Sequence, residues 1–319
     1  MCGQCGCGGE SEITLLDPQA GRETAMAREA SPGDPHEHVH ADGTRHSHAH
    51  SHGDHGDHPR GDHSHDHGHH DHGHGHHHGH DGHQPHRHDH GGVRAPTVVV
   101  DLDAAILSKN DALAAKNRAW FAGREILALN LVSSPGAGKT TLLERTIRDL
   151  RQTLPLLVIE GDQATANDGE RIRAAGAPAV QVNTGTGCHL DAEMVARGLM
   201  VLKPGVGSVV MIENVGNLVC PALFDLGERA KVVVLSTAEG EDKPLKYPHM
   251  FRAAQIMILN KIDLLPHLDY DVARAIANAH AVNPAIKTFL LSARTGEGLA
   301  SWYDWLRGEA AAARNAAVG

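Results

Sequence analysis

The sequence predicts an α/β fold in which helices cover both faces of a mostly parallel, doubly wound sheet. Three observations favour it: short apolar runs recur from residue 126 onward, they are rich in β-branched residues, and amphipathic helical patterns separate them. Residues 93–319 are long enough for one such domain with a sizeable core. The expected strands are Ile126–Val132, Leu156–Ile159, Ala179–Val182, Ser208–Ile212, Val232–Leu235, Ile256–Leu259 and Thr288–Leu291.

Three segments precede this domain, and none has the composition of a folded core. Residues 1–9 are rich in Cys and Gly, residues 10–35 have the pattern of a polar linker, and residues 36–92 form a tract of His, Asp and Gly. Residues 36–90 hold 24 of the 28 histidines. Because neutral imidazole is a ligand for Ni, Cu, Zn and Co ions, we expect this disordered N-terminal region to bind metal without a fixed fold.

Charge and composition exclude two classes of partner. The formal charge is −10, and residues 36–90 contain nine acidic residues against three arginines, which favours cations over nucleic acid. Aromatic residues make up only 3%, too few to favour base stacking. No apolar run is long enough to span a membrane, and the first residues lack the pattern of a secretory signal. We therefore expect a cytoplasmic protein that binds neither nucleic acid nor membrane.

The five cysteines are an odd number, and a reducing compartment would keep them as thiols. Cys2, Cys5 and Cys7, the N-terminal cysteine motif, place three thiolates within six residues. Such a soft set suits Ni(II) when a backbone or terminal amine completes it, and Zn²⁺ can use the same sulfurs in a tetrahedron. We predict a metal site there rather than a disulfide.

The first expected element of the domain is a helix over about Ala104–Arg124. Leu107, Leu113 and Trp120–Phe121 can share one of its faces. We predict that this helix braces the domain and carries no site.

A phosphate-binding loop follows the first predicted strand. Ser133-Ser134-Pro135-Gly136-Ala137-Gly138-Lys139-Thr140 opens a helix, which is the context of a P-loop, whose backbone amides bind phosphate. Lys139 would pair with the β- and γ-phosphate oxygens, and Thr140 would bind Mg²⁺. The residues expected to contact nucleotide here are Gly136, Gly138, Lys139, Thr140 and Thr141. The helix would turn three residues toward the core: Leu143, Ile147 and Leu150.

Three further elements follow in the order that GTPases use. Glu213-Asn214-Val215-Gly216 ends a strand, so that Glu213 would hold Mg²⁺ through a water and the Gly216 amide would meet the γ-phosphate. Asn260-Lys261-Ile262-Asp263 ends the next strand but one. The Asp263 carboxylate can accept two hydrogen bonds from guanine, whereas adenine offers no such donor pair, so GTP is favoured over ATP. Ser292-Ala293 resembles the base-contacting element that comes next.

The first switch segment is expected at residues 161–168, after a predicted strand. Asp168 would coordinate Mg²⁺ or position the attacking water, and Asp162 is the competing choice. The sequence leaves both open.

A second group of metal ligands lies within the domain. Cys188-His189 precedes a predicted helix, and Cys220 lies four residues beyond Gly216. Cys188, His189 and Cys220, here named the metal cluster, offer two thiolates and one imidazole, and a two-fold dimer would double the set. Because Cys220 lies on the segment expected to sense the γ-phosphate, GTP hydrolysis can change the metal geometry.

Together these residues resemble the HypB family, the nickel-inserting GTPases of nickel–iron hydrogenase maturation. The resemblance covers the N-terminal cysteine motif, the His-rich insert that some members have, and nearly all of residues 97–316. Its specific marks are Ser134–Thr140, Asn183-Thr184-Gly185 with Cys188-His189-Leu190-Asp191, Glu213–Pro221 and Asn260–Asp263.

The resemblance implies a P-loop NTPase fold and a dimerising metallochaperone that hydrolyses GTP slowly, as a timer. It implies a tight nickel site at the N-terminal cysteine motif and a weaker nickel or zinc site at the metal cluster, in the dimer interface. Lys246 falls where such proteins reach toward the partner subunit's nucleotide. The implied cofactors are GTP, Mg²⁺, Ni²⁺ and Zn²⁺, and the implied partners are a second copy of the chain, a HypA-type nickel accessory protein and the hydrogenase large-subunit precursor.

Three alternatives stay open. A urease-type nickel GTPase would share the mechanism with a different client, but that family carries Cys-Pro-His, whereas Cys188 is followed directly by His189. A nickel storage protein would make the nucleotide domain incidental. A zinc-allocating GTPase would use the same ligands for another ion.

Overall fold

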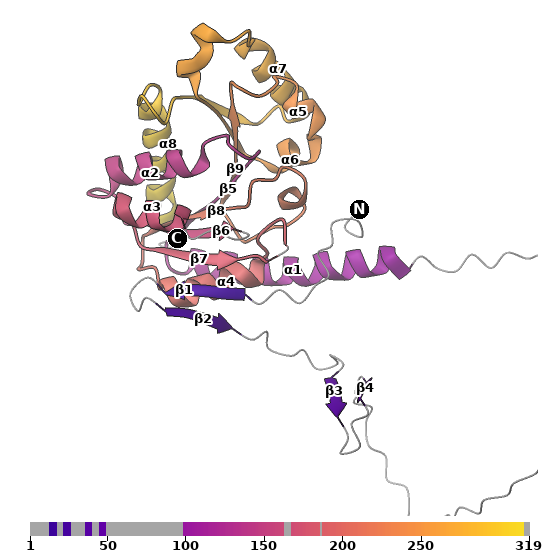
Figure 1. Ribbon diagram of the computed structural model, residues 1–319. Helices are drawn as coiled ribbons and strands as arrows, with labels where there is room; N and C mark the ends of the chain where they lie inside the picture. Colours follow the sequence, from indigo (N-terminus) through magenta and orange to yellow (C-terminus); the bar gives the residue numbers. More distant parts are fainter. Residues whose placement is uncertain are drawn as a thin grey trace, which may run out of the picture. The chain divides into compact units, whose positions relative to one another are not determined.

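The described part of the chain is organised by one large sheet (Figure 1). The computed structural model describes residues 13–17, 22–26, 36–39, 45–48, 98–162, 167–185 and 187–315. Seven strands run parallel, as the sequence predicts. They are β5 (Leu127–Ser133), β6 (Leu156–Asp162), β7 (Ala179–Asn183), β8 (Val209–Glu213), β9 (Ala230–Ser236), β10 (Ile256–Asn260) and β11 (Lys287–Leu290).

Two strands outside the predicted domain extend this sheet. β1 (Ile13–Asp17) pairs antiparallel with β7, and β2 (Arg22–Met26) pairs antiparallel with β1. The order across the sheet is β11-β10-β9-β5-β8-β6-β7-β1-β2. In the separate unit of residues 29–97, β3 (His36–Val39) pairs antiparallel with β4 (Arg45–His48). The sequence predicts none of these four strands, because β2, β3 and β4 are mostly polar and the apolar residues of β1 form only a short run. Strand pairing itself needs only backbone groups, which every residue except proline supplies in full.

The helices cover both faces of the parallel strands, which confirms the doubly wound prediction. On one face α2 (Lys139–Leu150), α3 (Asn167–Ala175) and α8 (Leu299–Asn315) pack on the sheet. On the other lie α1 (Val98–Ala122) and α4 (Ala192–Leu202), then α6 (Pro248–Ala253) and α7 (Val272–Val282). The described residues also form the short helix α5 (Lys243–Lys246) and the 3₁₀ turns η2 (Cys220–Ala222) and η3 (Ile262–His267).

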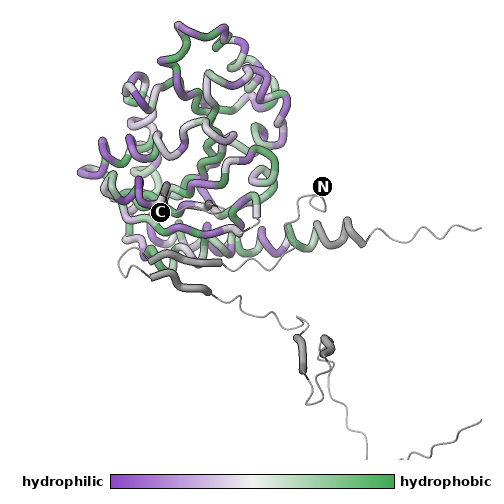
Figure 2. Tube along the Cα trace, in the orientation of Figure 1, coloured by the Kyte–Doolittle hydropathy of each residue, from purple (hydrophilic) through white to green (hydrophobic). Residues whose placement is uncertain are grey.

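The core forms two layers because successive strand residues point to opposite faces. In β5, Leu129 and Leu131 join the layer under α2 and α8, while Ala128 joins the layer under α1 and α4. Figure 2 shows this apolar colouring along the strands, with hydrophilic stretches on the outer helices and turns. As predicted, α2 buries Leu143, Ile147 and Leu150, and it buries Leu142 as well.

Helix α1 braces the domain, but the predicted face is partly wrong. Its buried positions include Asn110 and Asn117, whereas Leu107 and Leu113 are only half-buried. The Asn117 side chain donates to the carbonyls of Ala192 and Leu226, at 2.8 and 3.1 Å. Buried backbone carbonyls and amides need hydrogen-bond partners, and Asn110 and Asn117 supply them. Two asparagines therefore occupy positions where an apolar periodicity predicts leucine.

Among the residues that the structure describes, no helix is both long and apolar enough to cross a bilayer.

Candidate functional site

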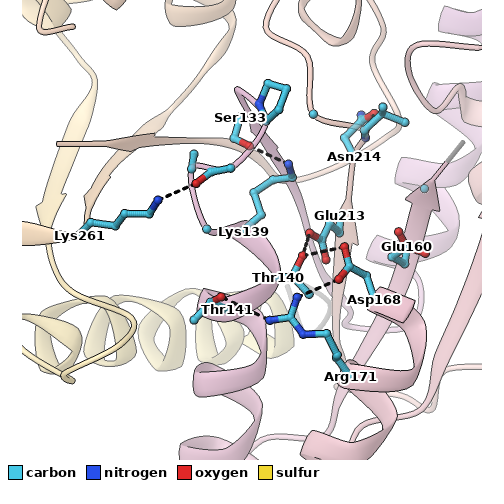
Figure 3. A pocket seen from close by; sticks show the side chains of 17 residues that line it. Ser133, Lys139, Thr140, Thr141, Glu160, Asp168, Arg171, Glu213, Asn214 and Lys261 are labelled. Atoms are coloured by element: carbon cyan, nitrogen blue, oxygen red, sulfur yellow. Dashed lines mark hydrogen bonds and ion pairs between the residues drawn. The ribbon is translucent and has the colours of Figure 1, made fainter. Parts of the chain in front are cut away.

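A cavity of about 440 Å³ opens where β5, β6 and β8 end, the edge at which doubly wound sheets bind ligands (Figure 3). The loop between β5 and α2 forms one wall, and Glu213 to Gly216 at the end of β8 form another. Glu160, Asp168 and Arg171 close the side nearest β6 and α3.

Lys139 is the buried cation of this cavity. Its side chain starts at the first residue of α2, directly after Gly138, whose φ of 98° is costly for other residues. Lys139 Nζ donates to Ser133 Oγ at 2.7 Å, and burial lowers the pKa of Lys139, against the attraction of Glu213, Asp168 and Glu160. The loop therefore presents a poorly hydrated positive charge to an anionic ligand.

A second cluster joins α2, β8 and α3. Thr140 Oγ1 donates to Glu213 Oε1 at 2.7 Å and lies 3.3 Å from Asp168 Oδ2. Arg171 pairs with Asp168 at 2.9 Å. Glu213 Oε2 is buried and has no hydrogen-bond partner among the described residues. A hydroxyl beside two carboxylates, one with an unused oxygen, has the donor set that suits Mg²⁺.

The burial of Glu213 makes stability depend on pH. Burial raises the pKa of Glu213 from 4.5 to about 7, although Lys139 and Thr140 oppose the shift. A carboxyl group whose pKa is higher in the folded state than in the unfolded state makes its full contribution to stability below its unfolded-state pKa. That contribution is lost as the pH rises through its folded-state pKa. In nucleotide-free protein we expect the contribution of Glu213 to the free energy of unfolding to fall by roughly 3 kcal/mol between its unfolded-state and folded-state pKa.

Glu213→Gln tests this dependence, because the amide cannot ionise. Urea unfolding between about pH 5 and pH 8 should show a flatter stability profile for the variant, which should be the more stable protein at the alkaline end. An unchanged profile would mean that Glu213 titrates normally.

The loop after β10 is tied to the P-loop. Asn260 Nδ2 donates to the Ala137 carbonyl at 2.9 Å, and Lys261 Nζ donates to the Gly136 carbonyl at 2.8 Å. The Ala293 amide donates to Asn260 Oδ1 at 3.0 Å. Asp263 Oδ1 is buried without a hydrogen-bond partner among the described residues, and a guanine base would supply donors for it.

The metal cluster draws its ligand atoms together within 4.8 Å of one another. Cys188 Sγ lies 2.8 Å from Cys220 Sγ and 3.6 Å from His189 Nδ1. Burial lowers the pKa of His189 to about 4, so its ring is neutral and can act as a ligand at physiological pH. The His189 ring packs on Phe224 with centroids 3.9 Å apart.

Other predicted residues lie elsewhere. Lys246 is exposed on α5, where it pairs with Asp242 at 2.8 Å, and is not among the residues that line the cavity. Ser292 is buried and accepts a hydrogen bond from the Thr295 amide on its side-chain oxygen. The N-terminal cysteine motif, nearly all of the His tract and the side chain of Asp162 lie outside the described residues.

Sequence reasoning missed Glu160 and Arg171. Glu160 lies in β6 and is buried, and Arg171 bridges Asp168 and Glu144 from α3. The signal for Glu160 was its place near the carboxyl end of a strand next to β8, since parallel strands end at one edge. No sequence pattern marks Arg171.

Comparisons with known proteins agree with this geometry. The family model described as CobW/HypB/UreG, nucleotide-binding domain, matches residues 127–289. The hydrogenase maturation factor HypB of Rhizobium leguminosarum bv. viciae is 58% identical over 240 residues, covering 74% of this chain and 80% of that relative.

Two solved structures are also similar. The HypB structure from Archaeoglobus fulgidus has a TM-score of 0.60 and 38% identity, covering 64% of this chain and 99% of the other. The HypB structure from Helicobacter pylori in complex with nickel has a TM-score of 0.59 and 36% identity, covering 63% and 95%.

Proposed function

The chain belongs to the HypB family, and we propose that it is a GTP-hydrolysing nickel metallochaperone that delivers Ni(II) to the large-subunit precursor of nickel–iron hydrogenase. The observation that carries the proposal is the position of the metal cluster. Two cysteine sulfurs and a neutral imidazole converge within 4.8 Å, and one of these residues, Cys220, lies on the segment that leads away from Glu213 and Gly216 in the nucleotide cavity.

In this proposal the nucleotide cavity is a slow GTPase. Lys139 binds the β- and γ-phosphates, Asp263 accepts hydrogen bonds from guanine, and Asp168 positions the attacking water. Thr140 and Glu213 would hold Mg²⁺, which when bound would neutralise phosphate charge. Hydrolysis removes the contact between γ-phosphate and Gly216, so the segment that leads to Cys220 relaxes.

We infer a homodimer in the GTP state, which places two metal clusters next to each other. Lys246 is suited to such an interface because its ammonium group is exposed and, among the described residues, its ion pair is with Asp242 at the start of its own helix. Nickel is the cargo, and zinc competes for the same ligands. A HypA-type accessory protein and the hydrogenase precursor are the partners that this role requires.

The direct test is hydrogenase activity in a strain that lacks this gene, at low and at added nickel. We expect the full chain to restore activity at low nickel, and Cys188→Ala to restore it only when nickel is added. Urease activity in the same strain separates the urease-type alternative. If the chain restores no hydrogenase activity at any nickel level, the proposed client is wrong.

Deleting residues 36–90 should lower nickel capacity by several ions per chain and leave GTP turnover unchanged. The deletion removes 24 histidines but no residue of the cavity lining, and it falls within the separate unit of residues 29–97. Equilibrium dialysis should also show capacity falling as pH drops through about 6.5, where imidazole becomes protonated. Equal nickel uptake with and without the tract would refute its storage role and favour the metal cluster as the main site.

A further inference from the structure

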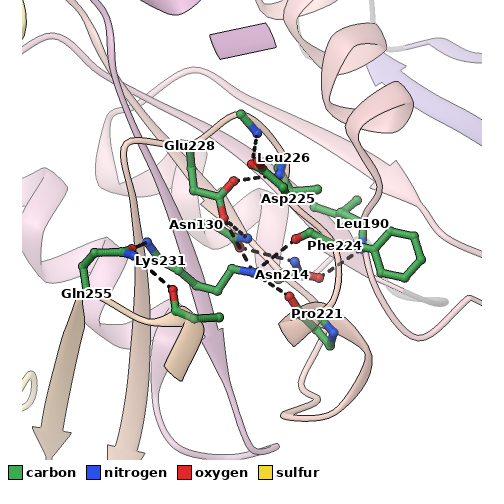
Figure 4. Close-up of polar contacts among 12 residues, drawn as sticks. Asn130, Leu190, Asn214, Pro221, Phe224, Asp225, Leu226, Glu228, Lys231 and Gln255 are labelled. Carbon is green, nitrogen blue, oxygen red and sulfur yellow. Dashed lines mark hydrogen bonds and ion pairs between the residues drawn. The ribbon is translucent and has the colours of Figure 1, made fainter. Parts of the chain in front are cut away.

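A chain of buried polar side chains runs through the domain beneath the two loops of the metal cluster (Figure 4). Lys231 and Glu228 are its charged members, with side chains each only 6% exposed and 3.8 Å between Nζ and Oε1. Placing such a pair in a core is costly unless hydrogen bonds satisfy both charges. Burial lowers the pKa of Lys231, and the negative charge of Glu228 opposes this shift.

Lys231 holds the loop that carries Cys220. Its Nζ donates to the carbonyls of Pro221 and Phe224, at 2.7 and 3.1 Å. Pro221 directly follows the cysteine, and Phe224 packs against the His189 ring. A shift of Lys231 therefore moves the backbone that carries Cys220 and the Phe224 ring that packs against His189.

Asn214 holds the other loop of the metal cluster. Its Oδ1 accepts from the Leu190 amide at 3.0 Å, immediately after Cys188-His189. Asn214 also lines the nucleotide cavity, directly after Glu213, and its Oδ1 accepts from the Val215 amide at 3.0 Å. The side chain thus lies between the segment expected to sense the γ-phosphate and a ligand loop.

Asn130 in β5 completes the connection. Its Oδ1 accepts from Asn214 Nδ2 at 3.3 Å, and its Nδ2 donates to Glu228 Oε1 at 3.1 Å. Asn130 is fully buried in β5, which lies between β8 and β9 in the sheet. Hydrogen bonds therefore lead from Leu190 through Asn214 and Asn130 to Glu228, and an ion pair continues from Glu228 to Lys231.

We propose that Asn214, Asn130, Glu228 and Lys231 are positioning residues that transmit nucleotide state to the metal cluster by moving both ligand loops together. The inference rests on the proposed function and specifies its regulation. When Asn214 shifts with Glu213 and Gly216, the hydrogen bonds on either side shift the Leu190 amide and the Pro221 carbonyl. The distances among the three ligands then depend on the nucleotide, as coupling through a contiguous network requires.

The test compares nickel affinity in two nucleotide states, GDP and a non-hydrolysable GTP analogue. The full chain carries Cys2→Ser, Cys5→Ser and Cys7→Ser, so that thiolate-to-nickel charge-transfer absorption reports only Cys188 and Cys220. The His tract competes equally in both states. We call this protein the reporter chain. Its ratio of nickel dissociation constants should differ from one by about 5- to 150-fold, the usual range of coupling between sites.

The decisive variant is Glu228→Gln with Lys231→Met, which removes both charges and keeps the volumes similar. In this variant we expect the nickel dissociation constants in the two nucleotide states to differ by less than about twofold. Nearly the whole coupling factor would then be lost. Without nickel, GTP affinity and turnover should be unchanged, because neither residue lines the cavity. Thr146→Val is the matched control: it removes a buried hydrogen bond from Trp302 on the opposite face and should keep the wild-type ratio.

A folded double variant with the wild-type ratio would overturn the proposal. If the variant does not fold, hydrogen exchange of the unsubstituted chain decides: residues 188–190 and 220–224 should exchange at different rates in the two nucleotide states, and identical rates would overturn the proposal. Failure of the proposed function looks different, because the reporter chain would then show no nickel–thiolate absorption in either state.

Discussion

Lys139→Ala should abolish measurable GTP hydrolysis and weaken GTP binding by roughly 10- to 150-fold, the equivalent of about 1.5–3 kcal/mol for a lost charged hydrogen bond. The effect is large because Lys139 is buried, and its Nζ is held 2.7 Å from Ser133 Oγ at the loop that would surround the phosphates. Displacement of a fluorescent guanine nucleotide measures the affinity, and phosphate release measures turnover.

Arg145→Ala is the control for that substitution. Arg145 lies on the same helix, α2, but pairs with Asp149 and does not line the cavity. Its removal should leave both measurements within about twofold, since a partly exposed pair on a helix contributes little. If Lys139→Ala binds GTP as tightly as the control does, the cavity is not the phosphate site.

Cys220→Ala should weaken nickel binding at the metal cluster by about 100-fold or more. Loss of an outer partner of a metal ligand already costs 10- to 100-fold, and this change removes a ligand itself. Titration of the reporter chain should show most of the nickel–thiolate absorption lost. GTP binding should persist, because Cys220 is not among the residues that line the cavity.

Val219→Ala is the neighbouring control. Val219 is 53% exposed, so its truncation removes little packing and no ligand. Nickel binding equal in Cys220→Ala and Val219→Ala would show that nickel binds elsewhere on the chain.

Much of the fold could be predicted because its signals are local. Seven apolar runs mark the parallel strands to within about three residues at either end, since strands covered on both faces are mostly apolar. The P-loop was readable for a similar reason: backbone amides can bind phosphate closely only where glycines such as Gly138 allow positive φ.

What the sequence hid depends on contacts between distant segments. In the sequence, Asn130 is a polar residue within an apolar strand, and Lys231 is a charged residue near a strand end. The fold places Glu228 between them as their common partner. The positions of buried polar residues follow no periodicity, because each is set by a hydrogen-bond partner on another element. The same holds for Asn110 and Asn117 of α1, whose partners lie about 75 to 115 residues away.

The choice between two switch acids shows where prediction from sequence ended. The sequence leaves Asp168 and the competing Asp162 both open. The fold brings the Asp168 carboxylate near Thr140 and Arg171, and the side chain of Asp162 lies outside the described residues. Their separate substitution to asparagine should identify the residue that supports hydrolysis.

The central claim is that the bound nucleotide sets the affinity of the metal cluster for nickel. Its most direct test is a pair of nickel isotherms of the reporter chain, one with GDP and one with the non-hydrolysable GTP analogue. We expect dissociation constants that differ by about 5- to 150-fold, with nickel changing the ratio of the two nucleotide affinities by the same factor. Superimposable isotherms would contradict it and leave Cys188, His189 and Cys220 as a site that does not respond to GTP.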